Sequence, residues 1–151
     1  MSADRIEREI TVAAPVERVW AVLTRPEHVG QWFGQGQPVR VDLRPGGVME
    51  LDHGKYGSYP TRIVRVDPPR FFSYRWASAF PGQETTDDNS TLVEFTLTPE
   101  GDATRLRMVE SGFARLEIPE ERLPYASHES HSEGWTEVLD TMRKYAEQQS
   151  A

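Results

Sequence analysis

The clearest hydrophobic pattern along the chain is a helical one near its end. Within residues 132–148, the apolar side chains recur at i, i+3, i+4, i+7 and i+10, as Trp135, Val138, Leu139, Met142 and Tyr145. This spacing is typical of a helix with one buried stripe, and charged residues occupy the other positions. Such a stripe needs an apolar partner, which the rest of the chain must supply. We expect Gly134, near the start of this helix, to allow a close approach to the surface beneath it.

Most of the chain before this helix alternates apolar and polar residues, which is the period of a half-buried strand. Strands are predicted over residues 6–12, 39–43, 49–53, 61–66, 72–76, 93–98 and 106–110, with turns at 44–47 and 99–102. Arg8 interrupts the apolar face of the first strand. In the strand over 61–66, Val64 and Val66 share one face while Ile63 falls on the other, which indicates a β-bulge.

Two short helices are predicted after the first strand. Pro15 stands where a helix begins without losing a needed N–H, and the apolar face that follows comprises Val16, Val19, Trp20 and Leu23. Pro26 is expected to open the second helix, which carries Trp32 and Phe33 at its end before two glycines stop it.

These elements predict an α+β fold in which the long helix lies across one face of a curved antiparallel sheet. The chain of 151 residues is expected to be one domain, 1–151, because it shows no repeat, linker or low-complexity tract. A domain of this size buries roughly 68–70% of the surface that its unfolded chain exposes. It therefore needs no disulfides, and it has no cysteine.

The alternation also predicts which side chains face the helix: Val39, Val41, Leu43, Met49, Leu51, Val64, Val66, Phe72, Tyr74, Trp76, Val93, Phe95, Leu97, Leu106 and Met108. Aromatic rings and methionines line pockets for apolar ligands, and they also fill solid cores. The composition of this face fits both a filled core and a cavity.

Polar residues that share the phase of the inner face are candidates for function. Glu110 follows Leu106 and Met108 in phase, so its carboxylate is expected to point toward the long helix, where His131 and His128 lie one and two turns before Trp135. A buried polar group without a partner costs about 1–3 kcal/mol. Glu110 is therefore expected to bind a ligand, or to be satisfied by Arg62, Arg107 or backbone donors.

Two further polar side chains share the phase of this face, His53 with Met49 and Arg62 with Val64. Together with Glu110, His131 and the Tyr74 hydroxyl, they would hold the polar end of a mostly apolar ligand. The same groups suit acid–base chemistry, with Glu110 as general base and a histidine as proton relay.

Charge and motif content limit the partners. The formal net charge is −7, and between Arg75 and Arg105 the chain has six acids and no Lys or Arg, which would repel phosphate backbones. No nucleic-acid partner is expected. The start of the chain is too charged for a signal peptide and no apolar run reaches membrane-spanning length, so a cytoplasmic protein without membrane insertion is expected.

Common cofactor and metal motifs are not found in the sequence. It contains no P-loop, no Gly-rich dinucleotide turn and no nucleophile elbow. His128 and His131 stand at i and i+3, which is not the spacing of the zinc-protease helix. We expect neither a metal nor a cofactor.

An ordered set of motifs resembles a known family. The segments are VAAPVERVWAVLT, GQWF, RPGGVMEL, VRVDPPRFFSYRW, TLVEFTLTPEGDATRLRMVESGF and EGWTEVLDTMRKYAEQ. From Ile6 to Ala146 they resemble the START-like SRPBCC superfamily, and most of all its branch of homologues of the activator of heat-shock-protein ATPase. The resemblance implies a helix-grip fold: about six or seven strands wrapped around the C-terminal helix, enclosing a hydrophobic cavity.

The superfamily includes lipid and hormone carriers, polyketide aromatase/cyclases and co-chaperone domains, so three functions stay open. The first is binding of a small hydrophobic or aromatic ligand by Phe33, Met49, His53, Arg62, Tyr74, Trp76, Phe95, Met108, Glu110 and Trp135. The second is an aromatase/cyclase- or hydrolase-like enzyme that uses Glu110 with His131. The third is a co-chaperone-like domain of the stress response, with a chaperone as partner. A homodimer is a further expectation.

Overall fold

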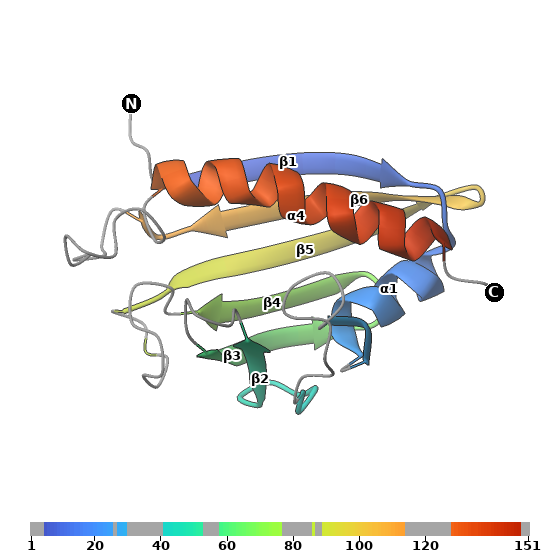
Figure 1. Cartoon of the computed structure of the whole chain (residues 1–151). Helices are drawn as coiled ribbons and strands as arrows, with labels where there is room; N and C mark the ends of the chain where they lie inside the picture. Colours follow the sequence, from blue (N-terminus) through green and yellow to red (C-terminus); the bar gives the residue numbers. More distant parts are fainter. Residues whose placement is uncertain are drawn as a thin grey trace.

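The sheet is the central element of the computed structural model, which describes residues 5–25, 27–29, 41–52, 58–76, 86, 89–113 and 128–148. The strands and helices follow one another as β1 (Arg5–Val12), α1 (Val16–Thr24), β2 (Val48–Asp52), β3 (Ser58–Asp67), β4 (Phe71–Trp76), β5 (Thr91–Glu100), β6 (Ala103–Ser111) and α4 (His128–Gln148) (Figure 1). Residues 27–29 form a further helical turn. Phe33, Val39 and His53 lie outside the described residues.

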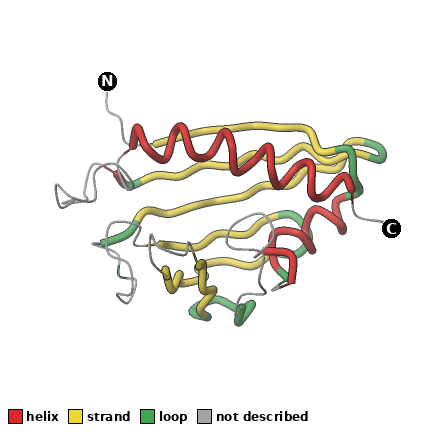
Figure 2. Tube along the Cα trace, in the orientation of Figure 1, coloured by secondary structure: helices red, strands yellow, loops and turns green. Residues whose placement is uncertain are grey.

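All neighbouring strands are antiparallel, in the order β1-β6-β5-β4-β3-β2. The first strand of the chain therefore pairs with the last, with Ile10 opposite Leu106. Figure 2 shows the strands as one curved layer with α4 lying along it. The predicted α+β architecture of a curved antiparallel sheet with a long C-terminal helix is confirmed, with six strands in the described part of the chain.

The alternation of β4, β5 and β6 is confirmed by burial. Their buried residues include the inward set Phe72, Tyr74, Trp76, Val93, Phe95, Leu97, Leu106 and Met108. The prediction for Leu43 is wrong, because its side chain is 39% exposed. Val41 makes an isolated bridge to Met49, and the Asp42 N–H then donates to the Val48 carbonyl as the chain turns. Leu43 thus belongs to the turn, where no strand alternation holds.

The predicted bulge in β3 is confirmed, but the inward residue is not the predicted one. The register shifts between Ile63 and Arg65, Ile63 is 1% exposed and Val64 is 41% exposed. Val64 is the extra residue at the shift, so the alternation changes phase there. Arg62 is therefore on the face opposite to Ile63, and its predicted inward direction is wrong.

Helix α4 buries the stripe that its sequence predicts. Its buried residues include Trp135, Leu139, Met142 and Ala146, while Val138 and Tyr145 are partly buried against the core. The helix runs beside β1 and β6 and ends beside α1 (Figure 1). There, Glu147 Oε2 accepts a hydrogen bond from the Ala13 N–H at 2.8 Å, and the Tyr145 hydroxyl lies 2.6 Å from His28 Nδ1.

Gly134 makes no close approach, which corrects the prediction for this residue. A Cβ built there would have no described atom within 4 Å. We expect Gly134→Ala to raise the free energy of unfolding by up to about 1 kcal/mol, because alanine loses less conformational entropy in a helix. Urea unfolding followed by circular dichroism measures the change.

Gly101→Ala is the matched control. Gly101 also has no described atom near a built Cβ, but its φ is +64°, in the left-handed region. Alanine there should lower the free energy of unfolding by about 1–2 kcal/mol. Changes of the same sign for the two variants would contradict this interpretation.

Candidate functional site

Glu110 stands in a row of buried residues that crosses the sheet. Ile63 is opposite Tyr74, Tyr74 opposite Val93, Val93 opposite Glu110, and Glu110 opposite Ile6. All five are buried, and Glu110 is 0% exposed. The strand phase therefore places one carboxylate at a position where the neighbouring strands carry apolar or aromatic side chains.

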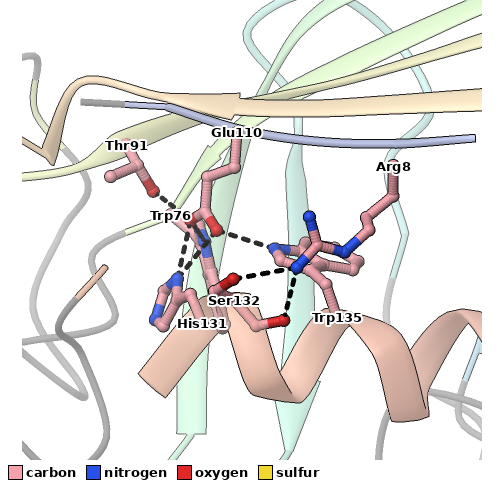
Figure 3. Close-up of polar contacts among 7 residues, drawn as sticks. All are labelled: Arg8, Trp76, Thr91, Glu110, His131, Ser132 and Trp135. Carbon is pink, nitrogen blue, oxygen red and sulfur yellow. Dashed lines mark hydrogen bonds and ion pairs between the residues drawn. The ribbon is translucent and has the colours of Figure 1, made fainter. Parts of the chain in front are cut away.

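Four side chains surround this carboxylate (Figure 3). Trp135 Nε1 donates to Oε1 at 2.7 Å, and Oε2 accepts from Trp76 Nε1 at 2.8 Å and from the Thr91 hydroxyl at 2.5 Å. His131 Nδ1 lies 2.8 Å from Oε1 and 2.9 Å from Oε2. Trp76 ends β4, Thr91 begins β5, and His131 and Trp135 are one turn apart in α4, so the cluster forms at one end of the sheet.

Electrostatics keep Glu110 ionised. Burial raises the pKa of its carboxyl, but the charge of His131 and the hydrogen bonds from His131, Thr91 and Trp135 outweigh burial, so the pKa lies below its ordinary value. Burial, and then the charge of Glu110, raise the pKa of the Tyr74 hydroxyl well above its ordinary value. At neutral pH Glu110 is thus a carboxylate and the phenol of Tyr74 is neutral.

His131 has one ring nitrogen in use and one unused. Its Nε2 atom is buried and has no hydrogen-bond partner among the described residues. The ring contacts two aromatic side chains, Trp76 at a centroid distance of 5.1 Å and Phe113 at 5.3 Å. The imidazole that carries the unpartnered Nε2 atom is thus packed against two aromatic rings.

Arg8 fixes the adjacent turn of α4. Its guanidinium donates to the carbonyl oxygen of Ser132 at 2.9 Å and to the Ser132 hydroxyl at 2.8 Å (Figure 3). This contact explains why a charged residue interrupts the inner face of β1. It ties the edge strand to the residue that follows His131.

The structure brings several of the predicted site residues together. Trp76, His131 and Trp135 all contact Glu110, and the Phe95 ring meets the Trp135 ring edge-on at 6.0 Å. Met108 is buried opposite Phe95. Met49 lies elsewhere, on β2 at the other edge of the sheet.

The expected ionic partners of Glu110 are wrong. Arg62 belongs to the other face, and Arg107 pairs with Glu7 on the exposed side at 3.1 Å. Sequence reasoning also missed Thr91, Phe113 and Ser132. Thr91 keeps the phase of Val93 and Phe95, so extending that strand backwards would have found it, whereas Phe113 lies beyond the end of β6, where no alternation applies.

A pocket of about 440 Å³ lies away from this cluster. Its lining comes from α1, the segment after residue 40 and Pro69, and comprises Glu17, Trp20, Ala21, Thr24, Arg25, Val41, Leu43 and Pro69. Within the described part of the chain, no three His, Asp or Glu side chains meet in a group that would hold a metal. Of the described helices, none combines the length and the apolar character needed to cross a bilayer.

Comparisons with known proteins agree with the fold. The family model described as activator of Hsp90 ATPase homolog 1-like protein matches residues 13–147. No curated protein matches the chain. Among solved structures, protein MLL2253 from Mesorhizobium loti is 23% identical with a TM-score of 0.74, and the match covers 97% of this chain and 99% of that one.

Two further solved structures match this chain over most of its length. The Aha1 dimer from Colwellia psychrerythraea is 14% identical with a TM-score of 0.75, and 97% of this chain and 98% of that chain are covered. PFC0360w, an HSP90 activator from Plasmodium falciparum, is 15% identical with a TM-score of 0.72, with 94% and 95% covered. At these identities the likeness concerns the fold.

Proposed function

This chain belongs to the family of activator of Hsp90 ATPase homolog 1-like proteins, and we propose that it acts there as a small-molecule-binding domain. The ligand is a small aromatic or mostly apolar molecule, and His131 holds its polar end. The observation that carries the proposal is the buried Nε2 atom of His131, which has no partner among the described residues. Burial of such an atom costs about 1–3 kcal/mol, and a ligand group that hydrogen bonds to it removes this cost.

The surroundings of Nε2 suit an aromatic ligand. Trp76 and Phe113 flank the imidazole, and Phe95, which meets Trp135 edge-on, is buried together with Met108 on the neighbouring strand. Glu110 and Trp135 take a supporting role, because the polar atoms of each are engaged by the other.

Equilibrium dialysis with two hydroxylated aromatics, 4-nitrophenol and 2-naphthol, tests the proposal. We expect both to bind, and His131→Phe to weaken binding about tenfold, since it keeps an aromatic ring but removes the hydrogen-bonding nitrogen. Leu43→Ser is the control for the pocket beside α1 and should leave binding unchanged. Absence of binding by both probes, or a loss caused by Leu43→Ser instead of His131→Phe, would overturn the proposal.

Family membership favours a second candidate function, co-chaperone-like contact with an Hsp90-type chaperone. One structural neighbour is described as an HSP90 activator and another as an Aha1 dimer. Stimulation of the ATPase rate of a purified Hsp90-type chaperone by this chain would support this function, and an unchanged rate would refute it. A homodimer of this chain stays a prediction.

A further inference from the structure

The pocket beside α1 is elongated along one face of that helix. Its lining includes the residues at i, i+3, i+4 and i+7 from Glu17, and also Arg25, which follows the end of the helix. At a rise of 1.5 Å per residue, the α-carbons of Glu17 and Arg25 are roughly 12 Å apart along the helix axis. The volume of about 440 Å³ lies within the usual range for small-ligand sites. The pocket is therefore a candidate site for a linear ligand, away from Glu110.

The walls between these two charged residues are mostly apolar and are anchored to the core. The Trp20 ring meets the buried Phe72 ring edge-on at 6.2 Å, and Val41 packs against the same core. Leu43, which is 39% exposed, and Pro69 complete this apolar part of the lining. A ligand with an apolar middle would remove this surface from water, which favours binding.

Three polar groups of the lining are available to a ligand. Among the described residues, the Glu17 carboxylate and the Arg25 guanidinium have no hydrogen-bond or ion-pair partner, and the Trp20 indole N–H has no acceptor. A guanidinium binds a carboxylate through two parallel hydrogen bonds, and a carboxylate accepts hydrogen bonds from an ammonium group. The pocket thus offers complementary charges to a molecule with an ammonium group at one end and a carboxylate at the other.

We propose that this pocket binds a short apolar peptide in extended form, with its amino end at Glu17 and its carboxylate at Arg25. An extended peptide spans at most about 3.3–3.6 Å per residue, so about three residues bridge the two charges. The macrodipole of α1 favours the opposite direction, but it places only about half an elementary charge at each end of the helix, and the full side-chain charges outweigh it. A carbonyl group of the peptide gives the Trp20 N–H an acceptor.

NMR titration of the ¹⁵N-labelled protein with trileucine tests the proposal. The indole N–H signal of Trp20, identified by its loss in Trp20→Phe, should shift, while the signals of Trp76 and Trp135, which donate to Glu110, should not. Trileucine amide and N-acetyl-trileucine each lack one end charge and should bind about threefold more weakly, as expected for the loss of one exposed ion pair. An unmoved Trp20 signal, or equal affinity for the three peptides, would overturn the proposal.

Charge-removing variants test the direction of the peptide. Arg25→Gln should abolish the preference for trileucine over its amide and keep the preference over N-acetyl-trileucine, and Glu17→Gln should do the reverse. Arg18→Gln and Glu27→Gln are the matched controls, because these residues are near in the sequence but do not line the pocket, and both preferences should remain. Loss of the same preference in a control and in its pocket variant would refute the site. His131 has no part in it, so this test is independent of the test of the proposed function.

Discussion

Replacement of Glu110 by alanine is expected to lower the free energy of unfolding by about 3–5 kcal/mol, the usual cost of removing one member of a buried charged pair. The carboxylate accepts hydrogen bonds from Trp76, Thr91 and Trp135, and it contacts His131. Without it, these four groups are left buried without their shared acceptor. The truncation also leaves a cavity where the side chain was 0% exposed. Urea unfolding followed by circular dichroism measures the loss.

Glu94→Ala is the control for this prediction. Glu94 lies on the neighbouring strand β5, opposite Val109 and Ser73, and its side chain is half-buried on the other face of the sheet. Its replacement should change the free energy of unfolding by about 0.5 kcal/mol or less. Equal losses for the two variants would mean that the cluster adds nothing to stability.

Trp135→Ala is expected to cost about 3–5 kcal/mol in the free energy of unfolding, as large-to-small replacements in cores do. The Trp135 ring is buried, meets the Phe95 ring edge-on at 6.0 Å and donates its N–H to Glu110. It therefore joins the apolar stripe of α4 to the buried carboxylate. Thermal and urea unfolding measure the loss.

A second replacement at Trp135 separates the packing of its ring from the hydrogen bond of its indole N–H, and a replacement at the next position is the control. Trp135→Phe keeps an aromatic ring and removes the donor, so it should cost about 1–3 kcal/mol, the penalty for a lost hydrogen bond in a buried cluster. Thr136→Ala, at the exposed next position, should cost about 0.5 kcal/mol or less. If Trp135→Phe cost as much as Trp135→Ala, packing of the ring would have no part in the effect.

The position of Glu110 was predictable from the sequence, whereas its partners were not. Strand alternation assigns each residue to a face, so a carboxylate in phase with Leu106 and Met108 had to point inward. Its donors come from the end of β4, the start of β5 and the first turns of α4. The order of the strands in the sheet and the angle of the helix decide which ends of these elements lie close together. The local alternation of apolar and polar residues shows neither of them.

The errors concentrate where the alternation is interrupted. Val64 and Arg62 were assigned to the wrong face because the bulge in β3 changes the phase, and the sequence indicates a bulge without showing which residue it adds. Leu43 was assigned inward because its apolar neighbours alternate, but the turn begins one residue earlier. Alternation predicts direction only where the ladder of hydrogen bonds is continuous.

The pairing of β1 with β6 determines when the sheet of a nascent chain can be completed. In the described sheet β1 lies at the edge, beside β6 and no other strand, so β1 finds its neighbour only after the four strands between them in the sequence have been synthesised. Until α4 also emerges, the apolar face of these strands stays exposed to solvent and to other chains. If synthesis stops before residue 128, the nascent sheet lacks helix α4, and its apolar face is uncovered. We expect the chain to be most prone to aggregation at this stage.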